Sequence, residues 1–158
     1  MRYYLIDKVT ALVPGERAAA VKCVTLSDEI LHDHFPDYPM LPGALIVEAA
    51  AQLSGFLLEM SFNGGDKPLV RALLVQIERA KFYDPVGPGE TLTLDARVES
   101  TRESSAQVVF DGRVGDKTVS RGTLTFVLKA IDSDRIHEQR RYVYRLWTRD
   151  FSPPLVLP

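Results

Sequence analysis

Cysteine is nearly absent from this chain of 158 residues, which contains only Cys23. A single cysteine cannot form a disulfide within the chain or supply a cysteine-rich zinc site. The sequence therefore favours a reducing compartment, and we expect the protein in the cytoplasm. Cys23 itself falls in an expected strand, where we predict a small buried side chain.

A clear excess of charge is also missing, since 19 lysines and arginines oppose 21 aspartates and glutamates. Proteins that bind nucleic acid usually concentrate positive charge on one surface, so nucleic acid is not an expected partner. The chain also lacks a run of about eighteen uncharged apolar residues, the length that spanning a bilayer requires. We expect no membrane span.

Hydrophobic residues make up 46 % of the chain, enough for the core of one domain. Residues 43–60 contain no proline, and their apolar side chains cover most of a helical circumference. This pattern predicts a helix that is buried nearly all round. Glu48 and Gln52 lie in its middle, where a buried polar group needs a partner or a function.

Strand-like segments stand on both sides of this helix. Residues 3–6 and 17–26, with a turn at 13–16, predict a hairpin, and the proline-containing segment 33–43 predicts an ordered loop. After the helix, residues 69–82, 92–98, 106–110 and 119–128 predict a meander. We therefore expect an α+β domain over residues 1–130, an antiparallel sheet around the long helix. Residues 131–158 form a C-terminal extension, arginine-rich and then proline-containing.

One segment has a recognisable motif. Residues 34–52 read HFPDYPMLPGALIVEAAAQ, which contains the run HFPxxPxxPG followed by ExxAQ. This motif resembles that of the FabZ-type β-hydroxyacyl-acyl carrier protein dehydratases, which have the hot-dog fold. Residues 5–9 and 81–90 also resemble the opening strand and the FxxPVxPGD stretch of that family. The resemblance covers roughly residues 3–128.

The resemblance implies a reaction and an assembly. It implies that His34 and Glu48 are an acid/base pair contributed by opposite subunits of a homodimer, alone or in a trimer of dimers. The pair would convert a (3R)-hydroxyacyl chain on acyl carrier protein into the trans-2-enoyl chain, with no cofactor and no metal. The residue types suit this chemistry, because imidazole is a base near neutral pH and a carboxyl group in an apolar site can act as the acid.

Further residues follow from position and resemblance. The Gly43 amide, at the start of the helix, would bind the thioester oxygen, and Gln52, four residues after Glu48, would orient its carboxyl group. Asp33 replaces the glycine that usually precedes the catalytic histidine in the family, and we expect it to modulate His34. An apolar tunnel along the helix would hold the acyl chain beside Phe56, Met60 and Phe82.

Other readings of the same residues remain open. A hot-dog thioesterase would hydrolyse the same class of substrate, and a non-catalytic acyl-binding subunit of a synthase complex would only hold it. The pathway is either fatty acid synthesis or a specialised lipid, polyene or polyketide route. The five arginines within residues 135–149 would contact an acidic carrier protein, lie in solvent or contact another subunit, and Arg79 and Lys81 are alternative carrier contacts.

Overall fold

Six strands and three helices follow one another along the chain in the computed structural model, which describes residues 3–65 and 68–158. The elements are β1 (Lys8–Val13), β2 (Arg17–Cys23), α1 (Ile30–Asp33), α2 (Gly43–Phe62), β3 (Val70–Phe82), β4 (Thr91–Arg102), β5 (Ser105–Val114), β6 (Lys117–Ala130) and α3 (Asp134–Trp147). The predicted order of hairpin, long helix and meander is confirmed.

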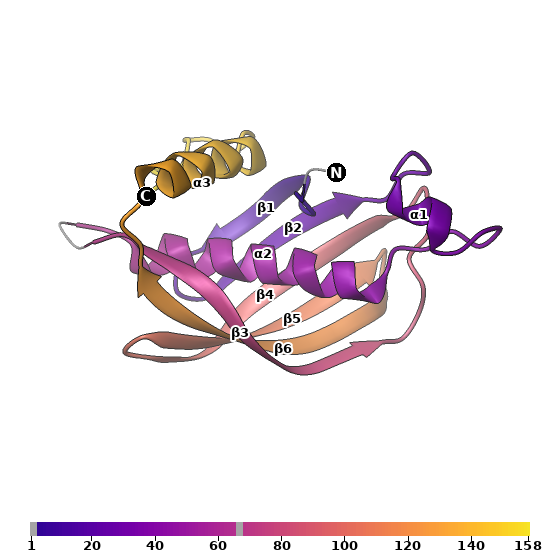
Figure 1. Cartoon of the computed structure of the whole chain (residues 1–158), viewed down its shortest axis with the longest axis horizontal. Helices are drawn as coiled ribbons and strands as arrows, with labels where there is room; N and C mark the ends of the chain where they lie inside the picture. The colour runs from indigo at the N-terminus through magenta and orange to yellow at the C-terminus, as the bar shows by residue number, and fades with distance from the viewer. Residues whose placement is uncertain (1–2, 66–67) are drawn as a thin grey trace.

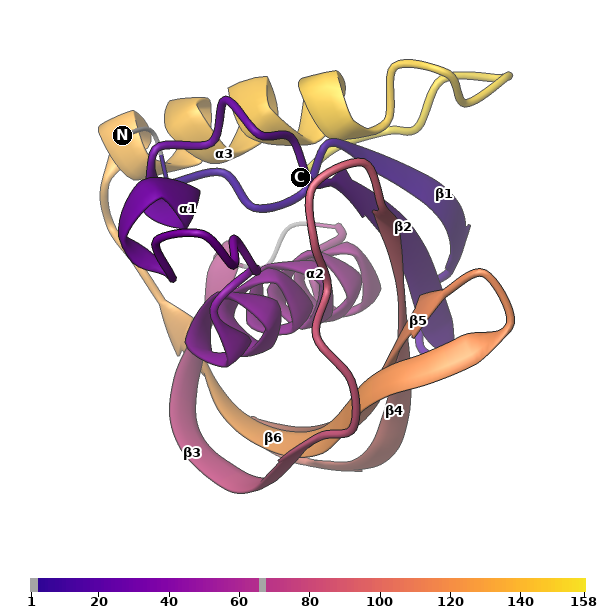
Figure 2. The same ribbon diagram turned by 90° about the vertical axis from the view of Figure 1, so that its right-hand side faces the viewer.

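The strands form a single antiparallel sheet in the order β1-β2-β4-β5-β6-β3. Figures 1 and 2 show this sheet curled around α2, which runs along its concave face. The predicted α+β architecture is therefore confirmed. β1 and β3 are the two edge strands, so each has one side without a strand partner within the described chain.

α2 is the centre of the core, as its sequence predicts. Leu53, Phe56, Leu57 and Leu58 are fully buried, and α2 contacts β2, β3, β4, β5 and β6. By length and composition alone this helix of 20 residues could cross a membrane, but 61 % of its most apolar window is buried inside the protein. Its apolar surface packs against the sheet, so α2 is the core helix of this domain.

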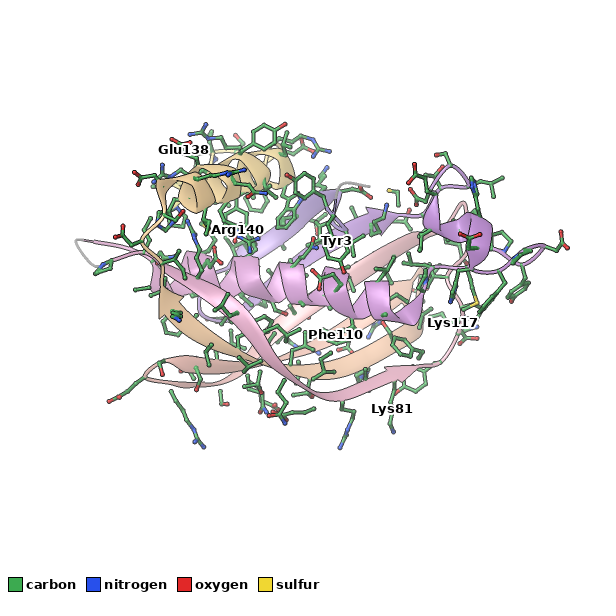
Figure 3. The ribbon with its side chains drawn as sticks, viewed as in Figure 1. Tyr3, Lys81, Phe110, Lys117, Glu138 and Arg140 are labelled. Atoms are coloured by element: carbon green, nitrogen blue, oxygen red, sulfur yellow. The ribbon has the colours of Figure 1, made fainter. Side chains whose placement is uncertain are left out.

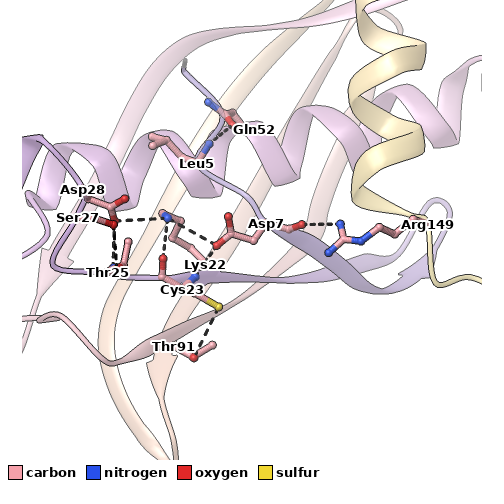
Figure 4. Close-up of polar contacts among 10 residues, drawn as sticks. All are labelled: Leu5, Asp7, Lys22, Cys23, Thr25, Ser27, Asp28, Gln52, Thr91 and Arg149. Carbon is pink, nitrogen blue, oxygen red and sulfur yellow. Dashed lines mark hydrogen bonds and ion pairs between the residues drawn. The ribbon is translucent and has the colours of Figure 1, made fainter. Parts of the chain in front are cut away.

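The start of the chain differs from the prediction. Residues 3–6 are not a strand, and β1 begins at Lys8. The reason is a competing partner: the Leu5 amide donates to the Gln52 side chain, and Gln52 donates to the Tyr3 carbonyl, so this segment is bound to α2. Figure 4 shows the Leu5 contact. The prediction for Cys23 is also wrong, since its side chain is exposed at the end of β2.

The C-terminal extension contains a helix that packs on the domain. Val143, Tyr144 and Trp147 of α3 are buried, and the rings of Tyr144 and Trp147 meet Phe56 of α2 edge to face. Figure 2 shows α3 lying across the open side of the curled sheet. At its end, Arg149 donates to the carbonyl of Asp7 (Figure 4). The apolar face of α3 is therefore buried against the domain and is not exposed to solvent.

Candidate active site

His34 directly follows the short helix α1 and is held by the loop that leads to α2. Its Nδ1 lies 2.9 Å from the carbonyl oxygen of Met40, and the Met40 amide donates to the His34 carbonyl. The loop is anchored in turn by the Leu41 amide, which donates to the Val86 carbonyl. Because a carbonyl oxygen only accepts, Nδ1 is the protonated nitrogen, and neutral His34 keeps a free lone pair on Nε2.

Asp33 is the last residue of α1, and its side chain is exposed. Within the described residues, Asp37 is the non-glycine residue with a positive φ. Asp33 therefore has an ordinary backbone conformation, and a residue with a Cβ atom fits here without strain. The structure thus gives no backbone reason for a glycine before His34, and the effect of the Asp33 charge stays a prediction.

Gly43 begins α2, and no side chain caps this helix end. The first amides of a helix lack partners within it, so they are available to an electronegative atom. A Cβ atom at Gly43 would lie 2.9 Å from Cζ of Phe82, so any other residue here would displace this ring. Phe82 therefore lies over the start of α2.

Glu48 and Gln52 lie one helical turn apart on α2 and contact each other. Nε2 of Gln52 donates to Oε1 of Glu48 at 3.0 Å. Gln52 is itself held by the two bonds to the backbone of Leu5 and Tyr3. The three bonds fix the amide group, and with it one oxygen of the half-buried Glu48 carboxyl group.

A cavity of about 780 Å³ lies between α2, β3, α3 and the N-terminal segment, and Glu48, Gln52 and Phe56 line it. Figure 3 shows Tyr3 and Arg140, which also line it, in the space between α2 and α3. Met60 and Phe82 are not among the lining residues, so of the three expected tunnel residues only Phe56 faces this space. The ring of Phe82 lies against Gly43 instead.

The structure does not bring all the expected site residues together within one chain. Among the described residues, His34 and Gly43 do not line the cavity that Glu48 and Gln52 line. The hydrogen bonds of His34 and Glu48 also go to different partners, Met40 and Gln52. Over residues 3–65 and 68–158, no group of three or more His, Cys, Asp or Glu side chains is placed to hold a metal ion.

A buried polar cluster beside the cavity was missed from the sequence. The Glu59 carboxylate accepts from Arg71 Nη1 and from the Tyr144 hydroxyl, both at 2.7 Å, and Arg71 Nη2 lies 2.8 Å from His137 Nδ1. Burial and the charge of Glu59 raise the pKa of Tyr144 well above its usual value. The available signal was Glu59, a second carboxylate on the apolar helix, eleven residues after Glu48.

Comparison with known proteins gives a consistent result. Residues 1–122 match the family model described as a FabA-like domain. The chain is 36 % identical over 126 residues to the 3-hydroxyacyl-[acyl-carrier-protein] dehydratase FabZ of Clostridioides difficile, covering 80 % of this chain and 87 % of the relative. Identity to the FabZ of Chlamydia trachomatis is 38 % over 128 residues, with coverage of 80 % and 82 %.

Among solved structures, smu.793 of Streptococcus mutans bound to acetyl CoA is similar in fold, with a TM-score of 0.63. Its sequence identity is 17 %, with coverage of 80 % of this chain and 90 % of that one. At this identity the likeness concerns the fold alone.

Proposed function

This chain belongs to the FabA-like family and is a 3-hydroxyacyl-acyl-carrier-protein dehydratase of fatty acid synthesis, and we propose that His34 and Glu48 are its catalytic pair. The thioesterase, non-catalytic and specialised-pathway readings are not favoured by these relatives. The observation that most supports the assignment is the Glu48 carboxyl group, held by Gln52 in the wall of a cavity large enough for an acyl chain.

His34 is the base in this proposal. The C2 proton of the substrate is weakly acidic because it lies next to the thioester carbonyl, and Nε2 of neutral His34 has the lone pair to accept it. Glu48 is the acid: its protonated carboxyl group gives a proton to the C3 hydroxyl, which leaves as water while the C2–C3 double bond forms. Exchange with solvent then returns both groups to their starting states.

Gly43 stabilises the charge that develops on the thioester oxygen. As C2 loses its proton, negative charge moves to this oxygen, and a fixed donor lowers the barrier. The Gly43 amide at the uncapped start of α2 is such a donor, and the helix dipole adds to its effect. Asp33, one residue before His34, adds a negative charge near the base and in this proposal tunes it.

The working unit in this proposal is a homodimer in the cytoplasm, alone or within a trimer of dimers. β3 supports it, because this edge strand of 13 residues exposes Leu73, Leu74, Val75, Ile77 and Phe82. A long apolar edge strand is a site for pairing with another chain. A second copy there would supply its own His34 to the cavity in which Glu48 lies, with acyl carrier protein as the substrate's carrier.

Mixing two inactive variants tests the pair and its sharing at once. His34→Ala and Glu48→Gln are each expected to lose nearly all hydration of trans-2-enoyl-carrier protein while the circular dichroism spectrum is retained. Co-expressed, they form hybrid dimers in which one of the two sites has both native residues. Random pairing in a two-fold dimer then restores about a quarter of the wild-type rate.

The controls separate the possible failures. Each variant expressed alone must stay inactive. The double variant His34→Ala/Glu48→Gln, co-expressed with wild type, measures how far inactive chains lower the rate of wild-type chains. If either single variant keeps a wild-type rate, the catalytic assignment is wrong. If both are inactive and co-expression restores nothing, although mass spectrometry detects hybrid dimers, the pair is contributed by one chain and the shared site is wrong.

A further inference from the structure

The cavity at Glu48 is roofed by a helix that lies outside the family-matched residues, since the match ends at residue 122 and α3 begins at Asp134. We propose that α3 is a specificity element, and that Trp147 with Gly55 of α2 sets the length of acyl chain that this enzyme accepts. This inference rests on the proposed function, because the chain is taken to enter from Glu48.

One face of α2 forms the floor of this cavity. Glu48, Gly55 and Glu59 line it, together with Ala51 between the first two, at the three-to-four-residue spacing of a single helical face. Ala51 and Gly55 are small, so the floor between the two carboxylates is open. A helix rises about 1.5 Å per residue, so this floor extends about 16 Å from Glu48 to Glu59.

α3 supplies the opposite wall. Val143, Tyr144 and Trp147 line the cavity, and the centroids of the Phe56 and Trp147 rings lie 6.3 Å apart. Phe56 is fully buried and Trp147 nearly so. These two rings are in contact, so an alkyl chain that leaves Glu48 along the floor passes beside them, with Ala51 and Gly55 below it and α3 above. Burying each methylene group there stabilises the bound chain by about 0.8 kcal/mol.

The far end of the cavity is polar, and its buried charges are paired. Glu59 and Arg71 pair there, and Tyr144 and His137 complete the cluster. An apolar chain gains nothing by displacing hydrogen-bonded charges, so it stops before them. An extended chain advances about 1.2 Å per bond, so about nine bonds cover the roughly 10.5 Å from Glu48, where C3 lies, to Gly55. The favoured substrate is therefore a chain of about twelve carbons.

Trp147 is the single tryptophan of the protein and reports directly on this wall. Saturated acyl-pantetheine thioesters of four to twelve carbons cannot be dehydrated, so titrating them into the intact protein measures binding alone. We expect the dodecanoyl thioester to change the emission of Trp147 and the butanoyl thioester to leave it unchanged. Equal responses to both, or a response to neither, would overturn the proposal.

Two substitutions then test chain length through turnover. Gly55→Leu fills the floor and should lower kcat/KM for the twelve-carbon enoyl substrate by more than about tenfold, with little effect on the four-carbon one. Gly55→Ala is the matched control, because its Cβ would meet Ala72 Cβ at an ordinary 4.0 Å. Trp147→Ala removes part of the apolar wall and should lower kcat/KM for the twelve-carbon substrate more than for the four-carbon one, while Tyr142→Ala, on the exposed face of α3, should change neither.

The outcomes remain distinguishable from failure of the proposed function. If no enoyl substrate is hydrated at any length but the dodecanoyl thioester alters Trp147 emission, the catalytic assignment fails and the acyl pocket stands. If short and long substrates are both turned over, and Gly55→Leu and Trp147→Ala change the two rates by the same factor, the dehydratase stands and α3 has no role in selection.

Discussion

Gln52 connects three parts of the molecule through one amide group. It donates to the Glu48 carboxyl group and to the Tyr3 carbonyl, and it accepts from the Leu5 amide. These bonds use both donors of the side chain and its oxygen, so the amide cannot rotate without breaking at least one of them. The orientation of Glu48 is thereby coupled to the N-terminal segment.

Removing this amide should slow the reaction without abolishing it. We expect Gln52→Ala to lower kcat by about tenfold to a hundredfold, with a smaller change in KM, because the carboxyl group is retained but no longer oriented. Steady-state kinetics measure the split. Gln107→Ala is the control, since Gln107 forms a comparable amide-carboxylate bond to Glu78 on the outer surface. An unchanged kcat in Gln52→Ala would show that Glu48 is oriented by other means.

The motif residues were predictable because their spacing is local. Glu48 and Gln52 had to share a helical face once residues 43–60 were taken as a helix, and the structure joins them. The lining of the cavity depends on which elements meet, and spacing along the sequence does not give this. Of the expected tunnel residues, Phe56 lines the cavity, while the ring of Phe82 lies against Gly43, 39 positions earlier in the sequence.

At the scale of elements, α3 is attached by a buried charge network as well as by apolar packing. Glu59 of α2 accepts from Arg71 of β3 and from Tyr144 of α3, and Arg71 also reaches His137 of α3. The pair is nearly inaccessible to solvent, so each charge depends on the other for its stabilisation. The cluster therefore fixes where α3 lies.

Weakening this network should destabilise the fold in a graded way. We expect Tyr144→Phe to lower the free energy of unfolding by about 1 to 2 kcal/mol, since one donor to Glu59 is lost. Arg71→Met should cost about 3 to 5 kcal/mol, because it leaves a buried carboxylate unpaired. Urea unfolding measures both. Tyr142→Phe, on the exposed face, should change nothing, and an effect equal to that of Tyr144→Phe would contradict the role of the Glu59 bond.

The contrast between α2 and α3 shows what sequence reasoning can reach. The long helix was predicted at Gly43–Met60 and is found at Gly43–Phe62, because its apolar pattern is continuous. α3 was obscured by its arginines, although Val143, Tyr144 and Trp147 follow helical spacing. The surface on which α3 packs could not be predicted from the sequence. Phe56 was assigned to the core helix, and in the structure its ring also packs against Tyr144 and Trp147 of α3.

At the scale of the whole molecule, two ion pairs connect three neighbouring strands of the sheet, β4, β5 and β6. The Asp111 carboxylate of β5 accepts from Arg97 of β4 and from Arg121 of β6. Burial raises the pKa of Asp111, but the bonds to Arg121 and then Arg97 outweigh it, so the net shift is downward from the ordinary 3.8. The native state therefore binds this proton more weakly than the unfolded chain.

The sign of this shift predicts the effect of acid. A lowered native pKa stabilises the fold above pH 3.8, and the stabilisation is lost as the pH falls through the lower native value. We expect Asp111→Asn to be less stable than wild type at pH 7 and the difference to shrink in acid, as measured by urea unfolding at several pH values. Asp116→Asn, in an exposed turn, is the control. A difference that is constant across pH would contradict the argument.

In the proposed homodimer, the two subunits meet at β3. This edge strand exposes Val75 and Ile77, each more than half accessible, while the other edge of the sheet is the shorter β1. A lysine on an edge strand opposes pairing, because its charge would be desolvated in the interface. If the proposed dimer is correct, light scattering should give the wild type the mass of two chains and Val75→Lys the 17.7 kDa of one.

Activity should fall with the assembly, because the partner's imidazole is removed from the site. Leu26→Lys is the matched control: it places the same charge on a side chain that is 64 % exposed but outside the strands, and it should keep both mass and rate. A Val75→Lys monomer with a full rate would mean that one chain contains the complete site. A Val75→Lys protein of unchanged mass would mean that the subunits meet elsewhere, and the apolar edge of β3 would then need another explanation.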